Sequence, residues 1–269
     1  MRRIQLYTTH LLNGRLILEL KEMREKYYRT FQEVFMAVQG KLKPIYGRGL
    51  PLVTICIPTR NEERFIGQAL YAIWRINLYP RVEVIVIDQE STDGTVMIAK
   101  KYGAKVINVE YERLGKRLGV GISRHVGSLE ARGEIIVQID ADTVLTPFVI
   151  PQAVAQLNDG GIGIYHVAHY YYDGNLLLNL VAHYYDKYFR KPYNTTGHFI
   201  AYTKTLYDHV QFDINAPFMG EDYDFGERVF KRFGEHIFRF DRAFTVLVSS
   251  RGYKRRGLFT HLEYVSRPT

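Results

Sequence analysis

Asp140 and Asp142, separated only by Ala141, are the residues of this 269-residue chain with the clearest capacity for chemistry. They follow the apolar stretch 135–139, which is typical of a strand covered on both faces in a parallel sheet. Side chains two positions apart in a strand point the same way, so the two carboxylates can offer hard oxygen ligands to one divalent cation. We predict a metal-diphosphate site where this strand ends, although a motif this short also occurs in exposed turns.

Strands and helices alternate along the chain before this pair. The pattern predicts strands at 52–57, 82–87 and 104–109 and helices at 63–74, 95–102 and 123–131. Such alternation is typical of a right-handed parallel sheet. The polar turns 58–62 and 88–94 then share one sheet edge with the two aspartates, which predicts a nucleotide crevice. No Gly-x-Gly-x-x-Gly follows the first strand, so a dinucleotide is not predicted.

The composition is that of an ordinary globular protein, with 46% hydrophobic and 24% charged residues. No apolar run approaches the roughly 20 residues that a membrane-spanning helix needs, and the N-terminus lacks a signal-peptide core. These features predict a cytoplasmic protein. The single Cys56 excludes an internal disulfide and is predicted to be a core residue of the first strand.

The net charge of +8 is concentrated at the two ends of the chain. Residues 1–50 carry ten Lys/Arg and four Glu, and residues 251–269 carry five Lys/Arg and one Glu, which leaves the middle slightly acidic. Basic ends suit a polyanionic partner such as nucleic acid, an anionic membrane surface or a phosphate-bearing substrate. Solvated surface charge is the alternative.

Three regions follow from these patterns. Residues 1–50 form a helical extension and linker, 51–150 the half with the predicted nucleotide crevice, and 151–269 a second half with a basic C-terminal segment. Apolar residues at steps of three and four predict a helix at 16–38. We expect it to pack on the body; pairing with a second subunit, as a homo-oligomer, or lying on a membrane are the alternatives. The many tyrosines of the second half suit packing, or a groove for a sugar ring or polyprenyl chain.

Five segments in this order resemble family 2 glycosyltransferases of the GT-A fold. They are residues 57–63, 88–95, 127–143, 196–199 and 220–222. The resemblance implies an α/β fold with a Rossmann-like, mostly parallel sheet flanked by helices. It makes residues 51–150 a nucleotide-sugar-binding half and residues 151–269 an acceptor-binding half. It also implies inverting transfer of a sugar from a nucleotide diphosphate sugar, UDP- or GDP-linked, with Mn²⁺ or Mg²⁺ on the diphosphate.

The resemblance also assigns donor-side roles. Asp142 would bind the metal directly, and Asp140 would contact the ribose or share the ion. Glu62 and Asp88 would hold the nucleoside by accepting hydrogen bonds from a ribose hydroxyl or a base N–H. Turn or helix capping is the alternative for both. The other predicted donor-side residues are Pro58, Thr59, Arg60, Lys116, Arg124 and Ala141.

On the acceptor side, Asp222 is the predicted general base, because inversion needs a carboxylate opposite the leaving group. Glu221 is the second candidate, although orienting the loop suits it better, and both residues could instead cap a helix. Basic residues and a Gly-His pair are predicted to bind the acceptor or the diphosphate; these are Gly197, His198, Arg251, Lys254, Arg255 and Arg256.

Two departures from the family pattern bear on the donor. Gln89-Glu90 stand where the family often has Asp-Gly or Gly-Gly, which leaves the donor base open, and His125 replaces a common Asn. The competing predictions are a nucleotidyltransferase, supported only by Arg60 after the first strand, and a non-catalytic basic module for nucleic acid or membrane. For the glycosyltransferase no nucleic acid partner is expected, and lipid phosphate, glycan and protein stay open as acceptors, with a preference for a lipid-linked or membrane-proximal one.

Overall fold

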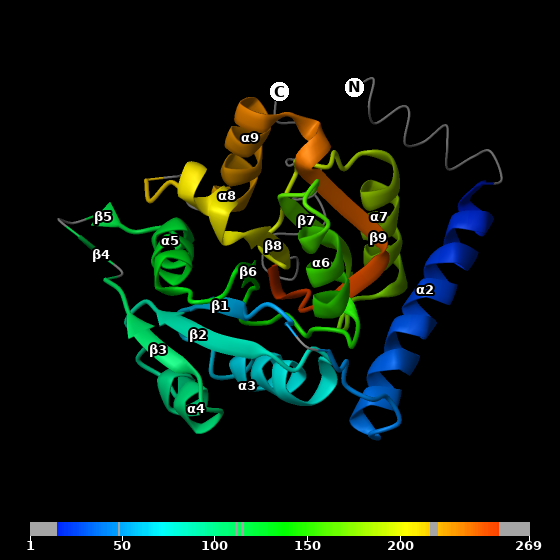
Figure 1. The fold of residues 1–269 in the computed structure, drawn as a ribbon. Coiled ribbons are helices and arrows are strands. Elements are labelled where there is room, and N and C mark those ends of the chain that lie inside the picture. The colour runs from blue at the N-terminus through cyan, green and yellow to red at the C-terminus, as the bar shows by residue number, and fades with distance from the viewer. Residues whose placement is uncertain (1–14, 48, 111, 114–115, 216–219, 253–269) are drawn as a thin grey trace.

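The computed structural model describes residues 15–47, 49–110, 112–113, 116–215 and 220–252. Seven strands form one sheet in the order β3-β2-β1-β6-β8-β7-β9. They are β1 (Val53–Thr59), β2 (Val82–Asp88), β3 (Lys105–Asn108), β6 (Ile135–Gln138), β7 (Ile164–Tyr171), β8 (Ile200–Thr203) and β9 (Phe238–Val248). A short hairpin of β4 (Glu112–Arg113) and β5 (Lys116–Arg117) stands apart from it (Figure 1).

The sheet is mostly parallel, as predicted. β1 pairs in parallel with β2 and β6, β2 with β3, and β7 with β9. Only β8 is antiparallel to its two neighbours, β6 and β7. All residues of β1 and β6 are buried, which explains why most of their residues are apolar on both faces of the sheet.

Helices cover both faces of the sheet (Figure 1). One apolar core contains residues of α3 (Ile66–Tyr71), α4 (Thr95–Lys101), α6 (Val149–Asn158) and α7 (Leu176–Tyr188). The other contains residues of α5 (Val120–Glu130), α8 (Lys204–His209) and α9 (Glu221–Phe233). Along β1, Ile55 and Ile57 face the first core and Cys56 faces the second, so Cys56 is the core residue that the sequence predicts.

Two predicted helix boundaries were wrong. The helix predicted from residue 63 begins at Ile66, because Glu62 and Glu63 form a turn whose backbone is held by other groups: the Glu62 N–H donates to Thr95 Oγ1 over 2.7 Å. It then continues into the π-turn η1 (Ala72–Ile76). The helix predicted from residue 123 begins three residues earlier, at Val120. A short 3-10 turn, η2 (Glu235–Ile237), precedes β9.

The predicted N-terminal helix is α2 (Arg15–Val38), which lies along α7 at one flank of the molecule (Figure 1). Met23 is 1% exposed and packs with Tyr170, Leu180 and Leu247 in a third apolar cluster. Packing on the body is therefore confirmed. Val38, counted in the predicted apolar stripe, is exposed. None of the helices in the described residues is both long enough and apolar enough to cross a bilayer.

The predicted division of the chain at residue 150 stays a prediction. Strands from both sides of that residue alternate within the one sheet, since β6 is followed across the sheet by β8, β7 and β9. The larger apolar core also takes residues from both sides, among them Ile57 and Phe199.

Two helix glycines test how tightly α9 is held. A Cβ at Gly226 of α9 would lie 2.2 Å from the backbone oxygen of Tyr193, whereas one at Gly67 of α3 would lie 3.7 Å from the nearest atom, Ile98 Cγ2. We expect Gly226→Ala to lower the free energy of unfolding by about 1–3 kcal/mol through overpacking. Gly67→Ala should raise it by up to about 1 kcal/mol through helix propensity. Urea denaturation checks both, and equal effects would contradict the close contact.

Candidate active site

Carboxylates gather where β1, β2 and β6 end. Thr59 is paired with Asp88 at the ends of β1 and β2, and Asp140 follows β6 by two residues. The register of the parallel strands brings the turns after them to one edge, as predicted. Asp222 reaches this edge from the first turn of α9, and Arg251 reaches it from the segment after β9.

Arg124 of α5 is the buried centre of the cluster. Its side chain is 2% exposed, its Nη2 lies 2.7 Å from Asp140 Oδ1, and its Nε lies 3.1 Å from Glu221 Oε1. Burial alone would lower the pKa of Arg124, but Asp140, Glu221 and Asp222 outweigh burial and raise that pKa. The guanidinium therefore stays charged and ties α5 to the end of β6 and to the start of α9.

The two aspartates of the Asp-Ala-Asp motif have different surroundings. Asp140 uses both oxygens, Oδ1 for Arg124 and Oδ2 for His198 Nδ1 over 3.0 Å. Burial would raise the pKa of Asp140, but Arg124 and His198 lower it well below its usual range. At Asp142, burial and the nearby charge of Asp140 raise the pKa, and Arg251 offsets this only in part. Ala141 between them is buried in the larger apolar core.

Arg251 lies between the motif and the first turn. Its Nε is 2.7 Å from Asp142 Oδ2, and its Nη2 donates to Glu62 Oε1 over 2.9 Å while Nη1 binds the other Glu62 oxygen. The guanidinium carbon lies 4.5 Å from the ring centroid of Phe65, a cation-π distance. Burial raises the pKa of Glu62 although Arg251 opposes the shift. Arg251, predicted to bind acceptor or diphosphate, thus contacts the predicted nucleoside and metal residues.

The turns after β1 and β2 brace each other. Asp88 Oδ1 accepts hydrogen bonds from Thr59 Oγ1 (3.1 Å) and Ser91 Oγ (2.6 Å), and Asp88 Oδ2 accepts one from the Ser91 N–H. Asn61 and Glu90 both have φ of 54°, a left-handed conformation that is uncommon outside glycine. Asp88 therefore holds its own turn, as the capping alternative predicts, and the strained backbone is concentrated at the predicted crevice.

Asp222, in the first turn of α9, is held by the backbone. Its Oδ2 accepts the Gly197 N–H and its Oδ1 accepts the Tyr223 N–H over 2.8 Å, so the backbone fixes the carboxylate. Burial and the neighbouring charge of Glu221 raise the pKa of Asp222 to about 6. Glu221 itself faces Arg124, which favours the orienting role predicted for it. A Cβ at Gly197 would lie 2.1 Å from Arg124 Nη2, so only glycine fits there.

The family model described as glycosyl transferase family 2 matches residues 54–221, which contain β1 to β8 and the Asp-Ala-Asp motif. The chain belongs to glycosyl transferase family 2. This confirms the predicted resemblance to family 2 glycosyltransferases. It favours glycosyl transfer over the nucleotidyltransferase and the non-catalytic binding module.

A curated relative of this chain is the 4,4'-diaponeurosporenoate glycosyltransferase of Staphylococcus aureus, 34% identical over 138 residues. The match takes in 48% of this chain and 36% of the relative, so the chain spans little more than a third of the relative's length.

Two solved structures share the fold. The mannosyltransferase PcManGT of Pyrobaculum calidifontis, in complex with GDP-Man and Mn²⁺, is 22% identical with a TM-score of 0.57, over 89% of this chain and 71% of that one. Glucosyl-3-phosphoglycerate synthase of Mycobacterium tuberculosis, with Mn²⁺, UDP-glucose and phosphoglyceric acid, has the same identity and TM-score over 81% of each chain. The predicted GT-A fold with an N-terminal helical extension is confirmed.

Some predicted site residues of the glycosyltransferase cannot be placed at the cluster. Lys254, Arg255 and Arg256 lie outside the described residues, and Lys116 is described only as part of the backbone of β5. Pro58 lies in the buried β1. Phe65 under Arg251 was not predicted, and its only sequence signal is its place directly after the first turn.

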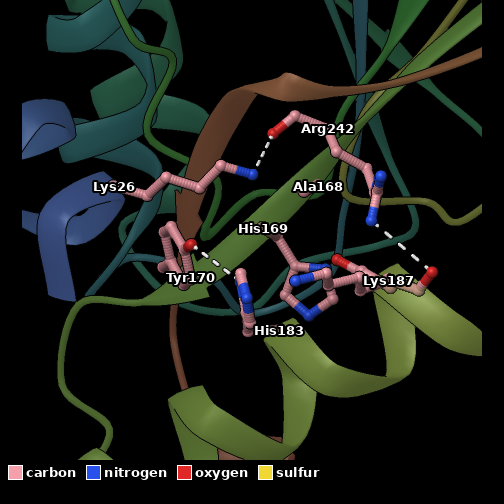
Figure 2. Close-up of a pocket in the computed structure, with 8 residues that line it drawn as sticks. Lys26, Ala168, His169, Tyr170, His183, Lys187 and Arg242 are labelled. Carbon is pink, nitrogen blue, oxygen red and sulfur yellow. Dashed lines mark hydrogen bonds between the residues drawn. The ribbon is translucent and has the colours of Figure 1, made fainter. Parts of the chain in front are cut away.

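A second polar cluster lies between α2 and α7, away from the sheet edge. Figure 2 shows Lys26, His183, Lys187 and Arg242 around a small pocket. Glu19, Glu22 and His183 are close enough to hold an ion, but Lys187 Nζ already lies 2.6–3.1 Å from both carboxylates. This ammonium offsets part of the charge of the two carboxylates, and the cluster fastens α2 to α7.

The buried position of Arg124 has a measurable consequence. We expect Arg124→Met to lower the free energy of unfolding by about 3–5 kcal/mol near neutral pH, because buried Glu221 loses its partner and half-buried Asp140 keeps only His198. Because the fold lowers the pKa of Asp140, this carboxylate stabilises the wild type fully at pH values above its usual pKa, and the contribution is lost as pH falls. The difference in unfolding free energy between the wild type and Arg124→Met should therefore shrink below about pH 4. Urea denaturation at several pH values measures this.

The matched control is Arg132→Met, which removes a guanidinium that is 79% exposed and paired with Glu83. Solvent screens that pair, so we expect a change below about 1 kcal/mol. Similar losses for the two variants would show that Arg124 does not have the buried role assigned to it.

Proposed function

We propose that this glycosyltransferase moves a sugar, with inversion, from a nucleotide diphosphate sugar to an acceptor hydroxyl or phosphate, with Mn²⁺ or Mg²⁺ bound at the donor. The observation that supports this most strongly is the convergence of Glu62, Asp142 and Asp222 around the Arg124–Asp140 pair at one sheet edge. Among the described residues of this cluster, carboxylates outnumber guanidinium groups, and such a surplus of negative charge favours a bound cation.

Asp142 is the residue that we assign to the metal. Both oxygens of Asp140 are occupied by Arg124 and His198, whereas among the described side chains only Arg251 pairs with Asp142. Carboxylate oxygens fit the hard ions Mn²⁺ and Mg²⁺, so the residues present suit the group. A bound ion would neutralise charge on the departing nucleoside diphosphate. Asp140 then orients His198 or contacts the ribose.

Arg251 has a second part in this proposal. The Arg251 side chain is 37% exposed, and its Nε makes a single contact with Asp142. A cation on Asp142 would repel it, and a diphosphate beside that cation would attract it. We therefore assign Arg251 to the donor diphosphate. Glu62 then loses its partner, and we assign it to the nucleoside. Thr59, Arg60 and the turn held by Asp88 are assigned to the nucleoside as well.

Asp222 is the proposed base. In a single displacement the acceptor oxygen attacks the anomeric carbon, the bond from that carbon to the diphosphate breaks, and the acceptor proton passes to Asp222. Two backbone N–H groups fix the carboxylate, and a pKa of about 6 suits a base that works near neutral pH. His198, 30% exposed and tied to Asp140, is the proposed acceptor contact between metal and base.

The names of the similar proteins support the donor class. One structure holds GDP-Man with Mn²⁺ and another UDP-glucose with Mn²⁺, so a UDP- or GDP-linked donor is proposed here. The relative named as a 4,4'-diaponeurosporenoate glycosyltransferase supports a lipid-like acceptor. The cytoplasmic location predicted from the sequence is retained as part of the proposal.

Three matched variants test the assignment of metal and base. Asp142→Asn should abolish the rise in melting temperature that Mn²⁺ and a nucleotide sugar together produce in the wild type. Asp222→Asn should keep that rise and lose transfer by on the order of a hundredfold or more. Asp159→Asn, at an exposed site after α6, should leave both unchanged.

A panel of UDP- and GDP-sugars identifies the donor in the same melting experiment, and release of nucleoside diphosphate reports its slow hydrolysis. If no nucleotide sugar in the panel binds, the proposed function is wrong. If Asp222→Asn transfers at the wild-type rate, the base is another residue.

The raised pKa of Asp222 predicts the pH dependence of the reaction. A base must have lost its proton, so kcat/KM should increase as pH rises through about 6 and fall away below it. The residual activity of Asp222→Asn should lack this acidic limb. An unchanged limb in that variant would assign it to a different group.

A further inference from the structure

One side of α2 is fixed to the body of the enzyme. Thr30 Oγ1 lies 2.9 Å from Thr245 Oγ1, and Lys26 Nζ donates to the backbone oxygen of Arg242 over 2.8 Å. Lys187 Nζ binds Glu19 and Glu22 one turn apart, and Figure 2 shows the hydrogen bond between Lys26 and Arg242. These contacts, with the buried Met23, set the rotation of the helix and hence the identity of its opposite face.

That opposite face carries large apolar side chains with basic ones between them. Ile17 is 72% exposed, Leu18 67%, Tyr28 65% and Phe35 61%. Between residues 17 and 38, the exposed basic residues of this helix are Lys21, Arg24 and Arg29. Within residues 17–38, Glu25 is the one exposed acidic residue. We call Ile17, Leu18, Lys21, Arg24, Tyr28, Arg29 and Phe35 the outer face of α2.

The segment after the helix continues this character. Lys41 and Lys43 are exposed, and Tyr46 is 82% exposed. Apolar side chains scattered singly on a surface need no explanation, but a row of them on the solvent side of one helix marks an interaction surface. Aromatic and aliphatic groups combined with Lys and Arg are typical of helices that lie in the plane of a membrane interface.

We propose that the outer face of α2 binds the surface of an anionic lipid bilayer, with Ile17, Leu18 and Phe35 entering the boundary of the acyl chains and the basic residues contacting lipid phosphates. The alternative partner is the same face of a second copy of the chain, and both the sequence pattern and the charge of the helix argue against it. Counting by sevens from Phe35 gives Tyr28 and then Lys21, so an apolar seam for a paired helix is broken. A twofold pairing would also bring two basic faces together, which anionic lipid instead attracts.

Nucleic acid is also a polyanion, but it gives no apolar environment for the exposed aliphatic residues at positions 17 and 18. The bilayer accounts for both the charge and the apolar groups. This inference goes beyond glycosyl transfer and does not depend on the donor chemistry. It places the enzyme where a lipid acceptor is concentrated.

Co-sedimentation of the full chain with vesicles tests the proposal. We expect binding to vesicles of phosphatidylcholine mixed with phosphatidylglycerol, weaker binding at high salt, and little binding to phosphatidylcholine alone. The double variant Lys21→Glu/Arg29→Glu should bind the anionic vesicles about tenfold more weakly or worse. Phe35→Ser should lose roughly tenfold through its apolar contact.

The matched controls lie on α4, on another side of the protein. Lys100→Glu/Lys101→Glu makes the same change in net charge, and Met97→Ser removes an apolar side chain that is 71% exposed. Both should bind vesicles as the wild type does. Wild-type melting temperature and nucleotide-sugar binding in every variant show that each is folded and that the transfer site is intact.

Three results would overturn the proposal. The first is wild-type vesicle binding by the outer-face variants, and the second is an equal loss in the α4 variants, which would indicate net charge alone. The third is a dimer, or binding to duplex DNA or RNA, that disappears with Phe35→Ser while the vesicles bind no protein. A failed donor screen with intact vesicle binding would count against the proposed function and leave this inference standing.

Discussion

The buried guanidinium of Arg124 is the interaction on which the rest of the site depends. It holds Asp140 at the end of β6 and Glu221 at the start of α9, and it leaves space only for glycine at position 197. Gly197 in turn donates its N–H to Asp222. The donor side and the proposed base are thereby positioned by one charge that water does not reach, so neither can move independently.

Charge also explains the unequal aspartates of the Asp-Ala-Asp motif. The first is neutralised by partners that are part of the fold, and its pKa is lowered; the second is buried beside it with a raised pKa and a partly exposed arginine as its partner. The two side chains are chemically identical, so only their neighbours distinguish them. The different roles that we propose for Asp140 and Asp142 rest on this difference in surroundings.

The sequence is sufficient to predict whatever depends on neighbours along the chain. The buried strands are apolar runs, the polar turns follow them, and the aspartates stand at the end of β6. What could not be predicted depends on contacts between distant residues. Arg124 and Glu221 are 97 residues apart, and Arg251 and Glu62 are 189 apart. The antiparallel insertion of β8 between β6 and β7 has no local signal either. The start of α3 was mistaken because Thr95, on another helix, binds the Glu62 N–H.

The position of Arg251 has a consequence for variants of its segment. β9 ends at Val248, so Arg251 belongs to no strand of the sheet. Its guanidinium is nevertheless the partner of both Glu62 and Asp142. The loss of this one side chain would therefore leave two neighbouring carboxylates without their counter-charge while every strand residue stayed in place.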